Sequence, residues 1–64
     1  MENCLKELRA RHNLTQEDLA NKAGVRRETI VFLEQGKYMP SLQLASKVAK
    51  IFRLPIEKVF KIDE

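Results

Sequence analysis

Apolar residues recur every three or four positions along most of the chain, and no stretch alternates between apolar and polar residues as a strand does. This spacing predicts helices throughout, because it gathers apolar side chains on one face of each 3.6-residue turn. We expect five helices, at about residues 2–12, 16–23, 27–35, 42–52 and 55–60. The predicted fold class is therefore all-α, a compact five-helix bundle that forms one domain over residues 1–64.

The apolar stripes of these helices identify the expected core. A chain of this length buries only roughly 60% of its unfolded surface, so we expect one small cluster, with Cys4 half-buried beside it. The positions predicted to face inward are Leu5, Leu8, Leu19, Ala20, Ala23, Val25, Ile30, Leu33, Leu42, Ala45, Val48, Ala49 and Phe52.

Capping residues mark the helix boundaries. Thr15 and Asp18 form the T-x-x-D variant of a capping box, which predicts a helix that begins at residue 16. Gly24 and Gly36 stand where helices are expected to end, since glycine adopts the left-handed conformation without a Cβ clash. Ser41 is the predicted cap of the helix at residues 42–52.

Residues 15–36 carry the most informative pattern. Two helices are joined there by a turn of about three residues, so they have to cross at a steep angle. Ala20 lets the two backbones approach closely, and Ile30 and Leu33 anchor the second helix. This pattern is typical of a helix-turn-helix, a unit that holds its second helix in the major groove of DNA.

The composition is that of a globular chain with a mild basic bias. Hydrophobic residues make up 44% and charged residues 33%, which argues against disorder, and the net charge is +3. Lys22, Arg26, Arg27 and Lys37 lie in or next to the motif, as in a nucleic-acid footprint. Charge alone favours a solvated mixed-charge surface, so the motif carries the nucleic-acid interpretation.

Reactive residues are too scarce for several classes of function. Cys4 and His12 are the single cysteine and histidine, so we expect no metal, no cofactor and no enzymatic activity. One unpaired cysteine fits a reducing, cytoplasmic compartment. No apolar run approaches the roughly 20 residues of a membrane span, and the charged N-terminus argues against a signal peptide.

From Leu5 to Phe60 the chain resembles a known family. The pattern that carries the resemblance is LxxLRxxxxLTQEDLAxxAGVxRxTIxxLExGKYxPSLxLAxKVAxxFxxPIExVF. It is similar to that of the short phage-repressor and Cro-like transcription regulators, also called the XRE family. The resemblance implies a compact five-helix domain of the lambda-repressor type that binds operator DNA as a symmetric dimer.

The resemblance also implies roles for residues that would face the groove. Gln16 matches a position where a glutamine meets a phosphate and supports the second motif helix. Arg27 and Glu28 match the main base-contacting positions, and Phe32 matches a groove-facing position one turn later.

Further matched positions lie at the edges of the motif. Gln35 and Lys37 match the region that meets the DNA backbone, and Arg9 and Glu34 match a pair that forms an internal salt bridge in some members. Arg26 stands where the family often has a capping serine, whose loss costs about 1 kcal/mol. We expect Arg26 to contact a phosphate instead.

The outward side chains of the second motif helix have alternative interpretations. Arg27 either pairs with guanine or contacts a phosphate, and Glu28 either accepts from the cytosine amino group or is a first-turn acid favoured by the helix dipole. Val31 and Phe32 are apolar where polar residues are more usual. They would contact thymine methyl groups, or one or both would be partly buried beneath the loop that contains Tyr38, or they would bind a protein partner.

The C-terminal part of the chain holds more apolar residues than one core stripe requires. We expect some of them to form a symmetric dimer contact, with Leu44, Ile51, Phe60 and Ile62 as the predicted positions. Alternatively, the last helix folds over the core and uses them within one chain. A dimer would place two recognition helices about 34 Å apart, one turn of DNA.

Two functions therefore compete. The leading prediction is a cytoplasmic transcription regulator, a repressor that binds specific double-stranded DNA as a homodimer. The alternative is a protein-interaction module, such as an antitoxin component, whose partner binds at Val31 and Phe32.

Overall fold

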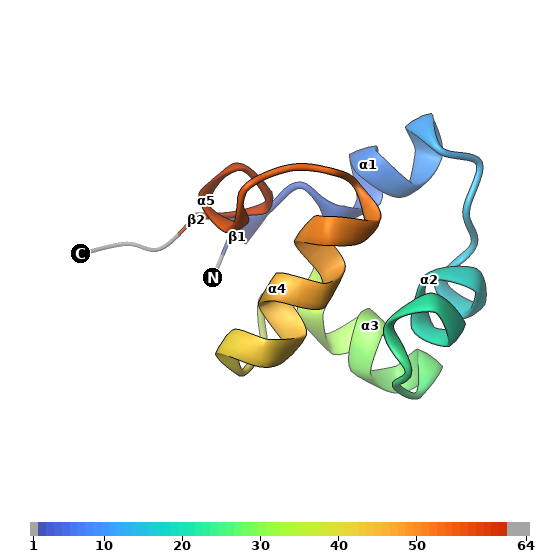
Figure 1. Cartoon of the computed structure of the whole chain (residues 1–64). Coiled ribbons are helices and arrows are strands. Elements are labelled where there is room, and N and C mark those ends of the chain that lie inside the picture. Colours follow the sequence, from blue (N-terminus) through green and yellow to red (C-terminus); the bar gives the residue numbers. More distant parts are fainter. Residues whose placement is uncertain (1, 62–64) are drawn as a thin grey trace.

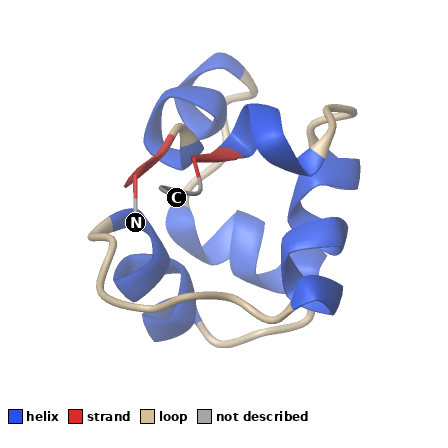
Figure 2. Cartoon of the chain, turned by 90° about the vertical axis from the view of Figure 1, so that its left-hand side faces the viewer, coloured by secondary structure: helices blue, strands red, loops and turns tan. Residues whose placement is uncertain are grey.

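The computed structural model describes residues 2–61, and these residues form five helices and a short two-stranded sheet (Figures 1 and 2). The elements in chain order are β1 (Glu2–Asn3), α1 (Leu5–Arg11), α2 (Gln16–Ala23), α3 (Arg27–Glu34), α4 (Leu42–Ile51), α5 (Ile56–Val59) and β2 (Phe60–Lys61). The predicted five-helix fold is confirmed. Among residues 2–61, no helix has both the length and the apolar character that crossing a membrane requires.

The sheet corrects the expectation that every element is helical. β1 and β2 pair antiparallel, with Asn3 opposite Phe60, so residues predicted at the ends of the first and last helices are extended instead. Strands of two residues are too short to show alternation, and their pairing joins opposite ends of the chain. The backbone N–H of Cys4 extends the contact by donating to the carbonyl of Val59 at 3.0 Å.

One apolar cluster fills the space between the helices. α4 runs diagonally through the middle of Figure 1, with α5 above it and the α2–α3 pair to its lower right. Val25 packs against this cluster while staying partly exposed, as its place in the tight turn requires. The buried residues are Leu5, Leu8, Leu19, Ala20, Ala23, Ile30, Leu33, Leu44, Ala45, Val48, Ala49, Phe52, Val59 and Phe60.

The inward face of α4 differs from its prediction. Leu42 was expected in the core and is instead 77% exposed, whereas Leu44 is buried. The buried positions begin at Leu44 and recur at Val48 and Phe52, one turn apart each time. By helical period Leu42 lies close to buried Ala49 around the helix, so its exposure follows from its place as the first residue of α4, where its side chain is left uncovered.

This packing also corrects two of the four positions predicted for a dimer contact. Leu44 and Phe60 are buried in the core of a single chain, so their side chains are already covered. Ile51 is half-buried and packs against the same core. Ile62 lies outside the described residues.

Four helices end in the same backbone motif. In each, a residue one or two positions after the helix adopts a positive φ, and the next N–H donates to a carbonyl five residues earlier, as in a Schellman motif. The positive-φ residues are Asn13 (55°), Gly24 (71°), Gly36 (74°) and Arg53 (57°). The two glycines confirm the predicted helix ends, while Asn13 and Arg53 perform the same role without being glycine.

Candidate nucleic-acid interface

The α2–α3 unit begins at the predicted capping box. The backbone N–H of Asp18 donates to the Thr15 hydroxyl at 3.0 Å, and the backbone N–H of Thr15 donates to the Asp18 carboxylate at 3.0 Å. These contacts lower the pKa of Asp18 below its usual value, with the hydrogen bond from the Thr15 backbone as the largest cause. The box fixes where α2 begins and so positions the neighbouring Gln16.

The turn between α2 and α3 depends on Gly24. Its φ is +71°, and a Cβ added there would meet no atom within 4 Å, so backbone conformation alone requires glycine. The N–H of Val25 closes the turn on the carbonyl of buried Ala20 at 3.0 Å. Arg26, the N-cap residue of α3, makes no capping side-chain hydrogen bond. This is expected, because an arginine replaces the capping serine that the family often has there.

α3 buries one face and exposes another. Ile30 and Leu33 are fully inside the core, as predicted. Glu28 and Phe32 lie on the exposed side, Phe32 with 49% of its surface exposed. With about half of its surface accessible, Phe32 is not buried beneath the loop that contains Tyr38, which is itself 43% exposed. Val31 is half-buried.

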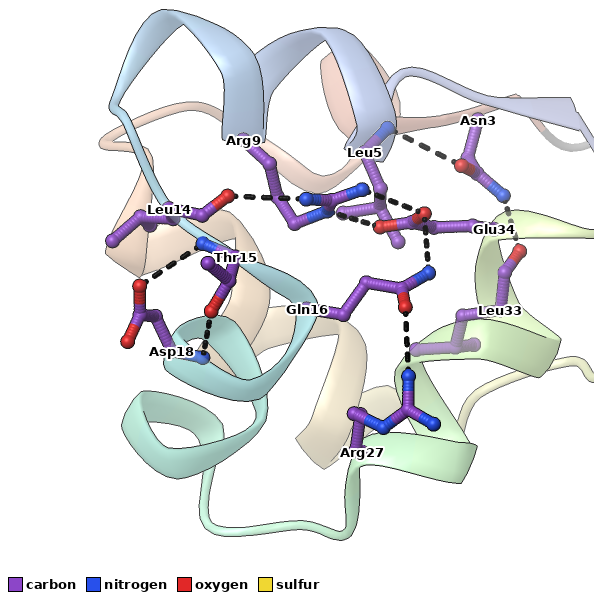
Figure 3. A network of polar contacts seen from close by, with 10 residues as sticks. All are labelled: Asn3, Leu5, Arg9, Leu14, Thr15, Gln16, Asp18, Arg27, Leu33 and Glu34. Carbon is purple, nitrogen blue, oxygen red and sulfur yellow. Dashed lines mark hydrogen bonds and ion pairs between the residues drawn. The ribbon is translucent and has the colours of Figure 1, made fainter.

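An ion pair joins α1 to the end of α3 (Figure 3). The Arg9 guanidinium donates from Nε to Oε2 of Glu34 and from Nη2 to Oε1 at 3.1 Å, and the side chains are 15% and 8% exposed. Arg9 also donates from Nη1 to the carbonyl of Leu14 at 3.0 Å. The predicted internal salt bridge is therefore confirmed, and it also holds the connection between α1 and α2.

Gln16 extends this ion pair to the start of α3. Its Nε2 donates to Oε1 of Glu34 at 3.2 Å, and its Oε1 accepts from Nη1 of Arg27 at 3.3 Å (Figure 3). Only this orientation of the amide satisfies both neighbours, because a carboxylate needs a donor and a guanidinium needs an acceptor. Gln16 therefore contacts the start of α3 through Arg27.

The sequence did not predict that these contacts form one network. Arg27 and Glu34 are seven residues apart and therefore share one side of α3. That spacing was a usable signal, but which residue of α2 lies between them depends on how the helices cross.

The amide of Asn3 was also missed. It donates from Nδ2 to the carbonyl of Leu33 at 2.6 Å, and its Oδ1 accepts from the backbone N–H of Leu5 at 3.2 Å. One side chain therefore starts α1 and holds the end of α3.

The structure brings two of the seven predicted DNA-contacting residues into direct contact, Gln16 and Arg27. Gln16 is half-buried, and the other six are exposed along α3 or beside it. These six are Arg26, Arg27, Glu28, Phe32, Gln35 and Lys37. Their arrangement provides guanidinium, carboxylate, amide, ammonium and aromatic groups on one accessible region around a helix.

Comparison with known proteins shows the family of this chain. A helix-turn-helix family model matches residues 5–59. The chain belongs to the family of helix-turn-helix transcriptional regulators. Proteins of this helix-turn-helix family are DNA-binding regulators and not enzymes.

Relatives of this helix-turn-helix protein occur in archaea and bacteria. An uncharacterized HTH-type transcriptional regulator of Archaeoglobus fulgidus is 59% identical over 64 residues, which cover 100% of this chain and 90% of the relative. A regulator of the same description from Methanocaldococcus jannaschii is 62% identical over 60 residues, 94% of this chain and 91% of the relative. The cryptic phage CTXphi transcriptional repressor RstR of Vibrio cholerae is 33% identical over 94% of this chain and 54% of its own length.

Proposed function

We propose that this protein is a repressor that binds a specific double-stranded DNA sequence by inserting α3 into the major groove. The observation that carries the proposal is the position of Arg27. It stands at the exposed start of α3, the end that enters the groove in this motif, and Gln16 holds its guanidinium from one side. The similarity to a named phage repressor supports the repressor role.

Base recognition is assigned to the exposed side of α3. Arg27 pairs with guanine, for which a bidentate guanidinium is well shaped. Glu28 accepts a hydrogen bond from a cytosine amino group, and the exposed ring of Phe32 contacts a thymine methyl group. Polar readout thus occupies the first turn of α3, and apolar readout follows one turn later.

Backbone contacts are assigned to the residues around this strip. Gln16, Arg26, Gln35 and Lys37 meet phosphates, and the two cations contribute most of the salt dependence. These contacts set the register of α3 but do not discriminate between bases.

We further propose that the protein acts in the cytoplasm as a symmetric homodimer. A small core and a pattern of apolar residues near the C-terminus support a second copy as the partner. Of the four positions predicted for this contact, Ile51 and Ile62 remain candidates, since Leu44 and Phe60 are in the core. Sedimentation that shows a monomer at micromolar to millimolar concentration, even with DNA, would contradict the dimer.

Selection of bound sequences from random duplex DNA tests the proposed function. We expect one recurrent motif, and we expect Arg27→Ala to lose roughly 1–3 kcal/mol of discrimination at a single base pair. Lys37→Ala is the matched control, because removing a backbone contact weakens all sequences to a similar extent. Failure of the wild-type protein to enrich any motif would refute sequence-specific binding.

The exposure of Phe32 favours a second candidate function, a surface for a protein partner. Stoichiometric co-purification of a partner with the wild-type protein and its loss with Phe32→Ala would support this alternative. If Phe32→Ala instead changes the selected DNA motif, the ring is assigned to DNA.

A further inference from the structure

Glu34 and Arg27 stand at opposite ends of α3, yet a third side chain links them. Oε1 of Glu34 accepts from Nε2 of Gln16 at 3.2 Å, and Oε1 of Gln16 accepts from Nη1 of Arg27 at 3.3 Å. These contacts run from a mostly buried carboxylate to an exposed guanidinium (Figure 3). The side chain of Glu34 therefore has little surface that a duplex can touch, but it is connected to one that a duplex can reach.

The negative charge of Glu34 sets the direction of both hydrogen bonds. A carboxylate only accepts, so the end of the Gln16 amide that faces it has to be the NH2 group. The oxygen of the amide is then left to face Arg27, whose guanidinium only donates. An amide turned the other way would set oxygen against carboxylate and N–H against guanidinium. Arg27 thus has an acceptor in Gln16 because position 34 is a carboxylate.

Arg9 fixes where that carboxylate lies. It donates from Nε to Oε2 of Glu34 and from Nη2 to Oε1 at 3.1 Å, and a pair of contacts of this kind restricts both groups to one plane. The remaining nitrogen of the guanidinium, Nη1, donates to the carbonyl of Leu14 at 3.0 Å. The orientation of Gln16 is therefore anchored in the packed part of the fold, on α1 and the connection that follows it.

The contact with Gln16 restricts what Arg27 can do at a duplex. It occupies one N–H of Nη1 and leaves Nε and Nη2, which form a fork that fits O6 and N7 of guanine. An unheld arginine on the surface is also free to turn to a phosphate, and a phosphate contact does not discriminate between bases. Holding Nη1 in place therefore favours the base over the backbone.

We propose that Glu34 is a positioning residue for base recognition, which holds the guanidinium of Arg27 on guanine through the Gln16 amide and touches no DNA itself. The assignment rests on the proposed function, in which Arg27 reads a base. It extends the residues that determine specificity from the exposed side of α3 to an ion pair with α1.

The first test uses Glu34→Gln, which keeps the shape of the side chain and removes its charge. A glutamine presents either end of its own amide to Gln16, so both orientations of Gln16 become available. The quantity measured is the ratio of the affinities for two duplexes, the selected motif and the same motif changed at the base pair that Arg27→Ala relaxes. We expect Glu34→Gln to lower this ratio about fivefold, the effect of one typical hydrogen bond. A defect in folding alone lowers both affinities alike and leaves the ratio unchanged.

Two further variants trace the route from Glu34 to the base. In a protein that already carries Arg27→Ala, Glu34→Gln should lower the ratio no further, because its effect passes through Arg27. Gln16→Leu removes the link and should lower the ratio about as much as Glu34→Gln, and combining the two should add nothing. Glu7→Gln, at an exposed position of α1, removes the same charge and is the matched control with the wild-type ratio.

A double variant keeps the test decisive if Glu34→Gln does not fold. Arg9→Met with Glu34→Met replaces the ion pair by apolar side chains, a change that buried pairs often tolerate. It frees the Gln16 amide in the same way, so we expect the same loss in the ratio. Thermal unfolding of each variant measures the folded fraction at the temperature of the binding assay.

The outcomes separate this assignment from the function beneath it. If Arg27→Ala relaxes one base pair but Glu34→Gln and the double methionine variant keep the wild-type ratio, Glu34 is not a positioning residue and the proposed function stands. An equal loss from Glu34→Gln with and without Arg27 would overturn the route through Arg27. If the wild-type protein enriches no motif, both the assignment and the proposed function are refuted.

Discussion

Gln16 shows how one side chain is given a defined orientation. An amide has a donor end and an acceptor end, and the carboxylate of Glu34 and the guanidinium of Arg27 select one of its two flips. These two contacts use one amide proton and one lone pair of Gln16. If Gln16 contacts DNA as proposed, its side chain would reach the duplex already ordered, which would reduce the entropy lost on binding.

The lowered pKa of Asp18 predicts how the free energy of unfolding depends on pH. Its pKa is lowered in the folded chain, chiefly by the hydrogen bond from the Thr15 backbone, so its contribution is present above the ordinary pKa of aspartate. That contribution is lost as the pH falls from about 4 through the lowered value. Chemical unfolding between pH 6 and pH 2.5 should therefore show a shallower loss of stability for Asp18→Asn than for the wild type.

Glu17→Gln, in the same first turn of α2, is the control for general charge effects. It leaves the capping box intact and should keep the wild-type decline. Equal slopes for Asp18→Asn and the wild type would contradict the assignment to Asp18.

At the scale of elements, the same backbone motif ends four of the helices. Each of four helices is followed within two residues by a residue with positive φ, and the chain uses glycine at two of these positions. Asparagine tolerates this conformation better than most residues, which suits Asn13. Arg53, at the end of α4, has no such advantage, and its backbone is the strained member of the set.

Arg53→Gly is therefore expected to stabilise the fold. Relief of the left-handed strain should raise the free energy of unfolding by roughly 0.5–1 kcal/mol, after the greater chain entropy of glycine is subtracted. Urea unfolding measures the change. Arg53→Ala removes the same charge and keeps the strained backbone, so it should stay close to the wild type.

A stabilisation of the same size in Arg53→Ala would point to the charge as the cause and contradict the argument from φ. The exposed position of Arg53 allows both variants to fold.

Local rules explain which elements the sequence predicted. Thr15 and Gly24 act through neighbours within five residues, so their roles were visible without knowledge of the fold. Ile30 and Leu33 followed from the period of one helix. In α4, positions 42 and 44 are both leucine, and the helical period alone does not decide which of the two faces the core.

Non-local pairing explains what the sequence did not predict. β1 and β2 are far apart along the chain, and neither is long enough to show a pattern. The Gln16 contacts depend on the crossing of α2 and α3. The residues of the candidate site were thus predictable one by one, while the network that orders them required the fold.

At the scale of the whole molecule, the Arg9–Glu34 pair couples the first helix to the third. Arg9 contacts the α1–α2 connection as well as Glu34, so one guanidinium joins three parts of the chain. Both side chains are mostly buried, which makes each charge costly without its partner.

A double-mutant cycle tests this coupling. Arg9→Met or Glu34→Met alone should lower the free energy of unfolding by roughly 3 kcal/mol, because each leaves a buried charge unpaired. The double variant should lose less than the sum of the two, as measured by urea unfolding. Arg11→Met, an exposed position on α1, should be close to neutral. Additive losses would contradict the coupling.

The pairing of β1 with β2 brings the two ends of the described chain side by side. Neighbouring antiparallel strands lie about 4.8 Å apart, so the described chain begins at residue 2 and ends at residue 61 on adjacent strands. A fold that begins and ends on paired strands is suited to circular permutation, and to insertion into a surface loop of another protein. The pairing of β1 with β2 would hold the two halves of the host loop close together, and the inserted helix-turn-helix would keep its fold.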